Sequence, residues 1–132
     1  MTAPETALTL RALIVDDDEL FAESLAALLG DEEAIDVIGW VSNGADAVDF
    51  VAAEHPDVVV MDIAMPRMNG VEAARIIGRD FPETRVIMLS GSLVGDALEE
   101  VAGKTGAAAY VTKARVALDL IPALKAIATR SN

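Results

Sequence analysis

The sequence predicts an α/β domain in which five β/α units surround a parallel sheet. Short apolar runs alternate along the chain with stretches in which apolar residues recur at helical spacing. The runs are apolar throughout, as is typical of strands that are buried on both faces of a parallel sheet. The 132 residues, 53% of them hydrophobic, are enough for one domain with a substantial core. Residues 1–9 are polar and predict a flexible N-terminal extension.

Strand and helix signals alternate through the first half of the chain. Strands are predicted at residues 13–15, around residues 37–41 and at residues 58–61. Asp18 is suited to cap the first helix, and the second helix ends at His55 because Pro56 disfavours helical backbone before it. The apolar positions of these helices are Phe21, Leu25, Leu28 and Leu29, ending near Gly30, and then Ala47, Val48 and Val51.

The second half contains three further helix signals and two strand signals. Asn69 and Glu72 have the spacing of a capping box, which predicts a helix from there to about Asp80. Pro122 is tolerable in the last helix only if it lies in about the first turn. The other predicted elements are a strand at 86–89, a loop from Gly91 to Gly95, a helix with Val94, Leu98 and Val101 on one face, a strand at 108–112, and a last helix with Ala117, Leu120, Ile121, Leu124 and Ile127 on one face.

The composition excludes several classes of protein. Twenty-two acidic residues against ten Lys and Arg give a formal charge of −12, which argues against nonspecific binding to DNA or to anionic membranes. The absence of cysteine excludes disulfides and thiolate metal sites. The sequence shows neither a signal peptide nor an apolar run of transmembrane length, so we expect a soluble, cytoplasmic protein.

Polar residues stand at the ends of four predicted strands. Asp16 and Asp17 follow the first strand, Asp62 the third, Ser90 the fourth and Lys113 the fifth. Reactive groups gather at the carboxyl ends of the strands in open α/β sheets, so these residues are predicted to converge. Hard oxygen ligands without a nearby His or Cys suit a divalent cation such as magnesium. An acidic metal site with a lone lysine indicates phosphoryl chemistry.

Each of these residues also has a structural interpretation. Asp18 falls where a helix cap is needed, so we assign it to the cap. Asp16 and Asp17 would lie close to Asp62 in a neighbouring strand, where their repulsion is costly without a cation. Lys113 could be a surface lysine and Ser90 a strand-end hydroxyl. Packing alone would account for Tyr110 and Trp40, and a structural position for His55.

Four segments together resemble the signature of two-component response-regulator receiver domains. They are Leu13-Ile14-Val15-Asp16-Asp17-Asp18, Val60-Met61-Asp62-Ile63-Ala64-Met65-Pro66-Arg67-Met68-Asn69-Gly70, Val86-Ile87-Met88-Leu89-Ser90 and Tyr110-Val111-Thr112-Lys113. The resemblance covers residues 10–130 and implies a flavodoxin-like (βα)5 doubly wound parallel sheet with strand order 2-1-3-4-5. The ending 106–114 is most similar to receivers of the NarL/FixJ type. Those usually carry a DNA-binding helix-turn-helix domain, which these 132 residues lack.

The resemblance also implies roles for individual residues. Asp62 would accept a phosphoryl group from a phosphohistidine of a sensor histidine kinase, and the domain would catalyse this reaction and its own slow dephosphorylation. Mg²⁺ or Mn²⁺ would be bound by Asp17 directly, by Asp16 through water, and by Asp62 and the backbone carbonyl of Ala64. Lys113 and Ser90 would contact the phosphoryl oxygens, while Ser90 and Tyr110 would act as the switch.

The resemblance implies that the domain controls a partner or an output domain for transcription, and a homodimer is one possible form of the partner. It would act through the face formed by the helix around 94–103, the strand at 108–112 and the last helix. The sequence leaves open whether a longer regulator continues beyond Asn132, and it gives this chain no nucleic-acid or membrane contact of its own. A pseudo-receiver, which binds partners without phosphorylation, is the main alternative.

Two further alternatives fit less well. A phosphatase of the haloacid-dehalogenase type needs a general acid two residues after the nucleophile, where Ala64 cannot transfer a proton. A flavin carrier needs a phosphate-binding loop where this chain has acids.

Two features of the site differ from the usual receiver pattern. Ala64 and Ser92 leave room for attacking water but do little to orient it. Lys113 precedes Ala114 and not proline, so we predict a trans peptide bond there.

Overall fold

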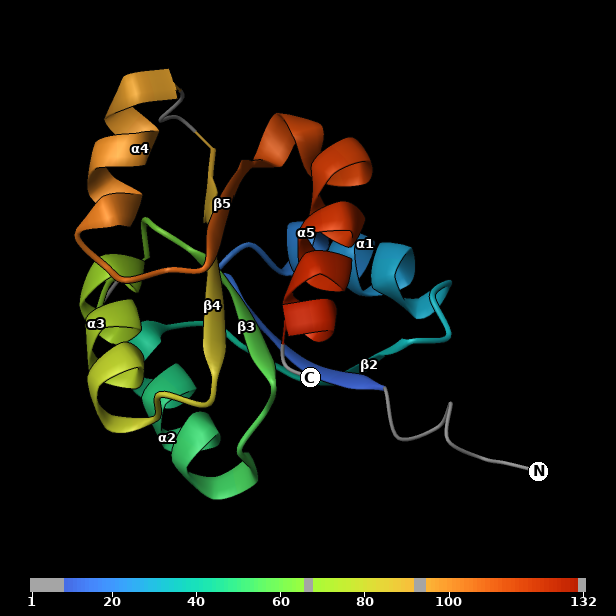
Figure 1. The fold of residues 1–132 in the computed structure, drawn as a ribbon, viewed down its shortest axis with the longest axis horizontal. Coiled ribbons are helices and arrows are strands. Elements are labelled where there is room, and N and C mark those ends of the chain that lie inside the picture. Colours follow the sequence, from blue (N-terminus) through green and yellow to red (C-terminus); the bar gives the residue numbers. More distant parts are fainter. Residues whose placement is uncertain (1–8, 66–67, 92–94, 131–132) are drawn as a thin grey trace.

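The computed structural model describes residues 9–130, apart from residues 66–67 and 92–94. Almost all of the predicted N-terminal extension therefore lies outside the described residues. Strands and helices alternate along the described chain (Figure 1). In order, they are β1 (Leu10–Val15), α1 (Glu19–Gly30), β2 (Ile35–Val41), α2 (Gly44–Glu54), β3 (Val58–Asp62), α3 (Gly70–Asp80), β4 (Arg85–Ser90), α4 (Gly95–Gly103), β5 (Ala109–Thr112), the short 3₁₀ helix η2 (Lys113–Arg115) and α5 (Val116–Arg130).

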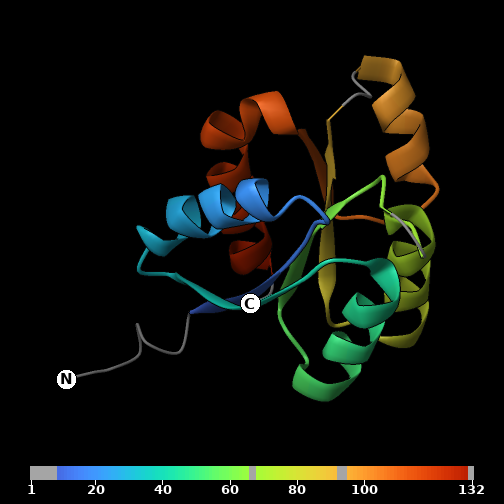
Figure 2. The same cartoon turned by 180° about the vertical axis from the view of Figure 1, so that it is seen from behind.

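The five strands form one parallel sheet in the order β2-β1-β3-β4-β5, which confirms the predicted fold. Helices cover both faces: α1 and α5 lie on one side, and α2, α3 and α4 lie on the other (Figures 1 and 2). Val15 of β1 pairs with Met61 of β3, and Ser90 of β4 pairs with Thr112 of β5. The strands therefore end at similar heights, and the residues that follow them share one edge of the sheet.

Alternating strand residues belong to two apolar layers, one on each face of the sheet. Ile14 and Val60 face α1 and α5, while Leu13 and Val59 face α2 and α3. All four side chains are essentially inaccessible to solvent, as the continuous apolar runs predicted. Burial on both faces makes the middle of the sheet a rigid support for the loops at its carboxyl edge.

The predicted caps are confirmed where the sequence placed them. The Asp18 side chain accepts a hydrogen bond from the Phe21 N–H, and the Asn69 side chain accepts one from the Glu72 N–H. The α3 helix then begins at Gly70, where a Cβ atom would lie 2.0 Å from the Asp62 carbonyl oxygen. A glycine is needed for this close approach, which fixes the loop after β3 against the start of α3.

Some expectations required correction. Pro122 lies well inside α5, which begins at Val116, and not in its first turn. The carbonyl that loses its N–H partner belongs to Leu118, a residue that is 66% exposed. Ala117 is exposed, although Leu120, Leu124 and Ile127 are buried as predicted. Val94 lies outside the described residues.

The predicted trans peptide before Ala114 is confirmed, because the described residues contain no cis bond. None of the described helices combines the length and the apolar character needed to cross a bilayer.

Candidate functional site

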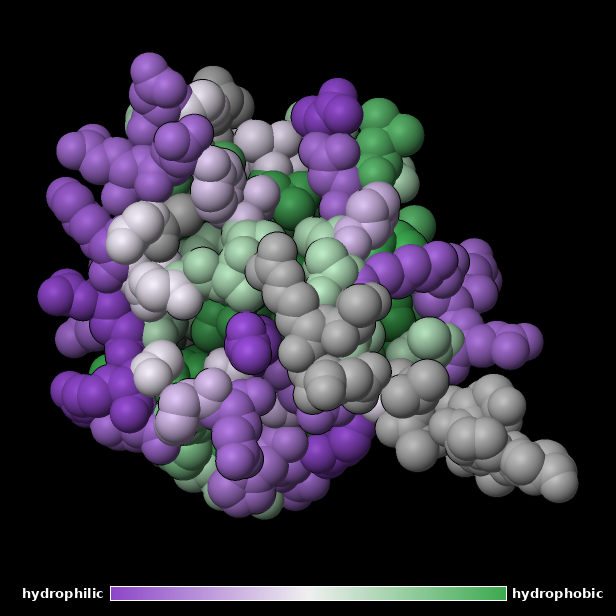
Figure 3. Space-filling view, in the orientation of Figure 1, coloured by the Kyte–Doolittle hydropathy of each residue, from purple (hydrophilic) through white to green (hydrophobic). Residues whose placement is uncertain are grey.

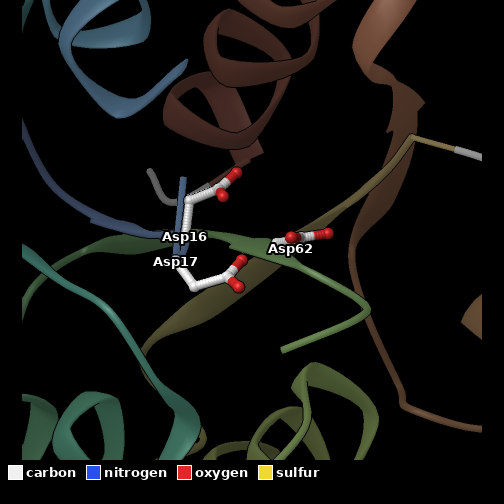
Figure 4. Close-up of side chains that lie close together, drawn as sticks. All are labelled: Asp16, Asp17 and Asp62. Atoms are coloured by element: carbon white, nitrogen blue, oxygen red, sulfur yellow. The ribbon is translucent and has the colours of Figure 1, made fainter. Parts of the chain in front are cut away.

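Three carboxylates meet at the carboxyl edge of the sheet. Asp16 and Asp17 follow β1, and Asp62 is the last residue of β3 (Figure 4). Each offers one oxygen atom, and these three oxygens lie within 4.8 Å of one another. Asp16 is completely buried, Asp62 is 6% exposed and Asp17 is exposed. The sequence prediction that these acids converge is therefore confirmed.

Lys113 supplies the positive charge at this cluster. Its Nζ lies 2.8 Å from Asp16 Oδ2 and 3.4 Å from Asp62 Oδ2. Partial burial disfavours the charged ammonium, but the hydrogen bonds and the attraction of the two carboxylates outweigh that cost and raise the pKa of Lys113. Lys113 begins η2 directly after β5. Although β3 and β4 lie between β5 and β1 in the sheet, the Lys113 side chain reaches the acids that follow β1 and end β3.

The Asp62 carboxylate is held in an unfavourable environment. Burial and the nearby Asp16 charge raise the pKa of Asp62 above its ordinary value. Lys113 and a 3.3 Å hydrogen bond from the Ala64 N–H to Asp62 Oδ1 oppose that effect without cancelling it. An additional cation near Asp62 would therefore stabilise its ionised form.

Backbone contacts fix the first acid. Asp16 Oδ1 accepts a hydrogen bond from the Asp18 N–H at 2.8 Å. The Asp16 carbonyl accepts another, also at 2.8 Å, from the indole Nε1 of Trp40 on β2. Sequence reasoning assigned Trp40 to packing and missed this contact. The adjacent strand register, with Trp40 opposite Ile14, could have indicated it.

Ser90 and Tyr110 occupy the predicted strands on the other side of Asp62. Ser90 is 3% exposed at the end of β4, and its neighbour Leu89 pairs with Asp62. Tyr110 on β5 is 40% exposed. Its pKa is raised by desolvation and by Glu99 of α4, which accepts a hydrogen bond from the phenol. Tyr110 thus links β5 to α4, whereas Ser90 lies on the strand next to the acids.

The cluster has the chemistry of a divalent metal site. Its three carboxylates exceed the single ammonium in charge, and all the candidate side-chain ligands are oxygen atoms. Asp16 Oδ2 is buried and has no well-oriented hydrogen bond among the described residues, although the Lys113 ammonium lies beside it. Such a set of hard donors fits Mg²⁺ or Mn²⁺. The acidic cluster could therefore bind a metal ion.

Comparison with known families and proteins identifies relatives along most of the chain. The sequence model of the "Response regulator receiver domain" matches residues 12–125. The transcriptional regulatory protein DegU of Brevibacillus brevis is 37% identical over 123 residues, which cover 90% of this chain and 50% of DegU. LnrK of Bacillus subtilis, also a transcriptional regulatory protein, is 35% identical over 122 residues, covering 89% of this chain and 53% of LnrK. The chain thus spans about half the length of these relatives.

Solved structures agree with the sequence comparison. The response regulator domain of Thermotoga maritima CheB has a TM-score of 0.83 and 30% identity, covering 92% of this chain and 97% of that one. The receiver domain of the NarL regulator from Mycobacterium tuberculosis has a TM-score of 0.82 and 27% identity, with coverage of 92% and 97%. The family match over residues 12–125 includes the edge of the sheet that carries the acids.

Proposed function

Because the chain belongs to the response regulator receiver domain family, we propose that it accepts a phosphoryl group on Asp62 and uses this change to control a partner. The observation that carries the proposal is the position of Asp62. It ends the central strand β3, lies in one cluster with Asp16 and Asp17, and is 3.4 Å from the Lys113 ammonium. We take residues 10–130 as the phosphoacceptor unit.

In the proposed reaction, a carboxylate oxygen of Asp62 attacks the phosphorus of a phosphohistidine on a sensor histidine kinase. The new O–P bond forms while the P–N bond breaks, and the departing imidazole takes up a proton from water. Lys113 turns from the carboxylates to a phosphoryl oxygen, and the Ser90 hydroxyl donates to another. These contacts stabilise charge that develops during transfer.

Mg²⁺ or Mn²⁺ would neutralise further negative charge on the phosphoryl oxygens. Asp17, Asp62 and the Ala64 carbonyl would bind the ion directly, and Asp16 would bind it through water. The raised pKa of Asp62 gives these residues a second role, because a cation held there favours the ionised nucleophile. Ala64 has no group that orients water, so we expect slow autodephosphorylation and classify the domain as a signalling module.

The output is proposed to pass through α4, β5 and α5. Ser90 and Tyr110 are the switch residues, since Ser90 is close to Asp62 and Tyr110 contacts Glu99 on α4. The outer side of α3 and α4 is hydrophilic (Figure 3), and α4 exposes Asp96, Glu99 and Glu100. A partner with a basic contact surface would suit this face.

The partner could be the kinase, an effector or a second copy of the chain. A transcriptional output is consistent with the relatives, and we place the protein in the cytoplasm, where such regulators act.

The direct test is phosphorylation by acetyl phosphate with and without Mg²⁺. Intact mass spectrometry should show one added phosphoryl group only when Mg²⁺ is present, and Asp62→Asn should abolish the addition. Asp57→Asn is the matched control because Asp57 lies at the opposite end of β3, and it should be modified like the native chain. Modification that persists in Asp62→Asn would disprove this nucleophile. A native chain that is never modified would indicate a pseudo-receiver.

A further inference from the structure

Lys113 has a third neighbour whose role the proposed chemistry leaves unassigned. Its Nζ lies 4.4 Å from the centroid of the Phe21 ring. Phe21 belongs to the first turn of α1, and its side chain is half-buried against the apolar layer beneath α1 and α5. The ammonium therefore contacts an aromatic face as well as two carboxylates.

The ring is held in place independently of Lys113. The Phe21 N–H is bonded to the Asp18 cap, and the ring packs with the buried core that contains Leu25 and Leu120. An ammonium over an aromatic face within about 6 Å is attracted by the ring quadrupole. The ring thus favours the same position of the ammonium as the carboxylates of Asp16 and Asp62 do.

We propose that Phe21 is a positioning residue for Lys113, holding the ammonium where it can contact first the carboxylates and then a phosphoryl oxygen. The inference rests on the proposed phosphoryl role of Lys113. It assigns to α1 a direct part in the site: one side chain keeps the cation at the edge of the sheet while its anionic partners change.

Two ligands should respond to a Phe21 change in opposite directions. A divalent cation competes with the Lys113 ammonium for the carboxylates of Asp16 and Asp62. Loss of the ring weakens the ammonium as a competitor, so the metal should bind more tightly. A phosphoryl group instead needs the ammonium as a partner, so its analogue should bind less tightly. General damage to the site would weaken both.

The experiment uses Phe21→Leu, which removes the aromatic face and keeps an apolar side chain. Mg²⁺ affinity is measured by titration followed through Trp40 fluorescence, and beryllofluoride affinity is measured at saturating Mg²⁺. We expect Mg²⁺ to bind about two- to fivefold more tightly and beryllofluoride about two- to fivefold less tightly, the size of one cation–π contact.

Two variants separate the ring face from packing. Phe21→Tyr retains the ring, and both affinities should remain native. Phe81→Leu makes the same exchange at a half-buried position in the layer beneath α2 and α3, and it should change neither affinity. If Phe21→Leu weakens both ligands, or if Phe21→Tyr behaves like Phe21→Leu, the positioning role is overturned.

Lys113→Met distinguishes this inference from the proposed function beneath it. It should weaken beryllofluoride strongly, and adding Phe21→Leu should have no further effect on that affinity. A normal beryllofluoride affinity in Lys113→Met would refute the phosphoryl role of Lys113 itself. A large loss in Lys113→Met with native affinities in Phe21→Leu would refute only the role of Phe21.

Discussion

At the amino end of the sheet, Arg11 and Asp57 have hydrogen-bonded partners, whereas at the carboxyl end two buried carboxylates share the Lys113 ammonium and a third lies beside them. Near the start of β1, the Arg11 N–H donates to Asp57 Oδ2 at 2.8 Å. The Arg11 guanidinium donates to the carbonyls of Glu54 and His55, at 2.8 and 3.0 Å, where α2 ends. These contacts connect β1, the start of β3 and the end of α2. The Asp57 carboxylate has a donor, and the Arg11 guanidinium has acceptors.

At the carboxyl end of the same strands, the described residues carry more negative than positive charge. Asp16 and Asp62 are both buried, and among the described residues Lys113 is the one cation that forms ion pairs with them. Burial and repulsion raise the pKa of Asp62, so its ionised form is less stable here than in water. A single sheet thus stabilises the fold at one end and retains excess charge at the other, where a cation or phosphoryl group can relieve it.

The largest expected effect comes from the backbone that supports the acidic end. Gly70→Ala would place Cβ 2.0 Å from the Asp62 carbonyl oxygen, which is main-chain and cannot rotate away. We expect the free energy of unfolding to fall by about 3 kcal/mol or more, the range for severe overpacking. Urea denaturation followed by circular dichroism measures the change.

Gly78→Ala is the matched control, because it adds the same methyl group to the same helix. The nearest atom would be the Thr105 carbonyl oxygen at 3.8 Å, an ordinary contact. Alanine also favours helix by about 0.5–1 kcal/mol over glycine, so this variant should be slightly stabilised. Equal destabilisation of both variants would show that the close approach after β3 does not matter.

A smaller effect is expected at the amino end of the sheet. Thr84 is buried, and its hydroxyl donates to the Pro56 carbonyl at 2.8 Å. Thr84→Val keeps the shape of the side chain and removes the donor, so we expect a loss of about 1–2 kcal/mol. Ser42→Ala, at an exposed position, should change stability by less than about 0.5 kcal/mol. A neutral Thr84→Val would mean that polar contacts at this end contribute little.

The sequence predicted features that depend on short segments of chain. Asp18 and Asn69 could be recognised as caps because a cap is determined by a few neighbouring residues. Asp16 and Asp62 could be expected to meet because buried parallel strands bring their carboxyl ends to one edge. The strand order itself came from the resemblance to known receivers.

Features that depend on side-chain geometry between elements were missed. The Trp40 indole reaches the Asp16 carbonyl from β2, and the Phe21 ring lies beside Lys113, but neither pair has a local sequence signal. Pro122 was restricted to a first turn by a local rule, which counts the lost N–H donor and the clash with the Leu118 carbonyl. That rule leaves out packing between elements, and Leu120, Leu124 and Ile127 of the same helix are buried in the core.

The comparison also predicts how stability depends on pH when no metal is present. Because the folded-state pKa of Asp62 is raised above the ordinary value of 3.8, the folded protein binds this proton more readily than the unfolded chain. Stability therefore decreases as the pH rises from the unfolded to the folded pKa, and the full penalty remains at neutral pH. Asp62→Asn should be more stable than the native chain at about pH 7 in EDTA, and the difference should shrink towards about pH 4.

Urea unfolding of both proteins at several pH values measures this difference, with Asp57→Asn as the control at the amino end of the sheet. Asp57 accepts a hydrogen bond from the Arg11 backbone, so its replacement should give no stabilisation. Saturating Mg²⁺ should then favour the native chain over Asp62→Asn, because an ion that binds only the folded state adds its binding free energy to stability. An Asp62→Asn variant that is less stable than the native chain in EDTA at neutral pH would mean that Lys113 already compensates fully for the buried charge. The excess charge at the carboxyl end would then not be the reason why the site binds a cation.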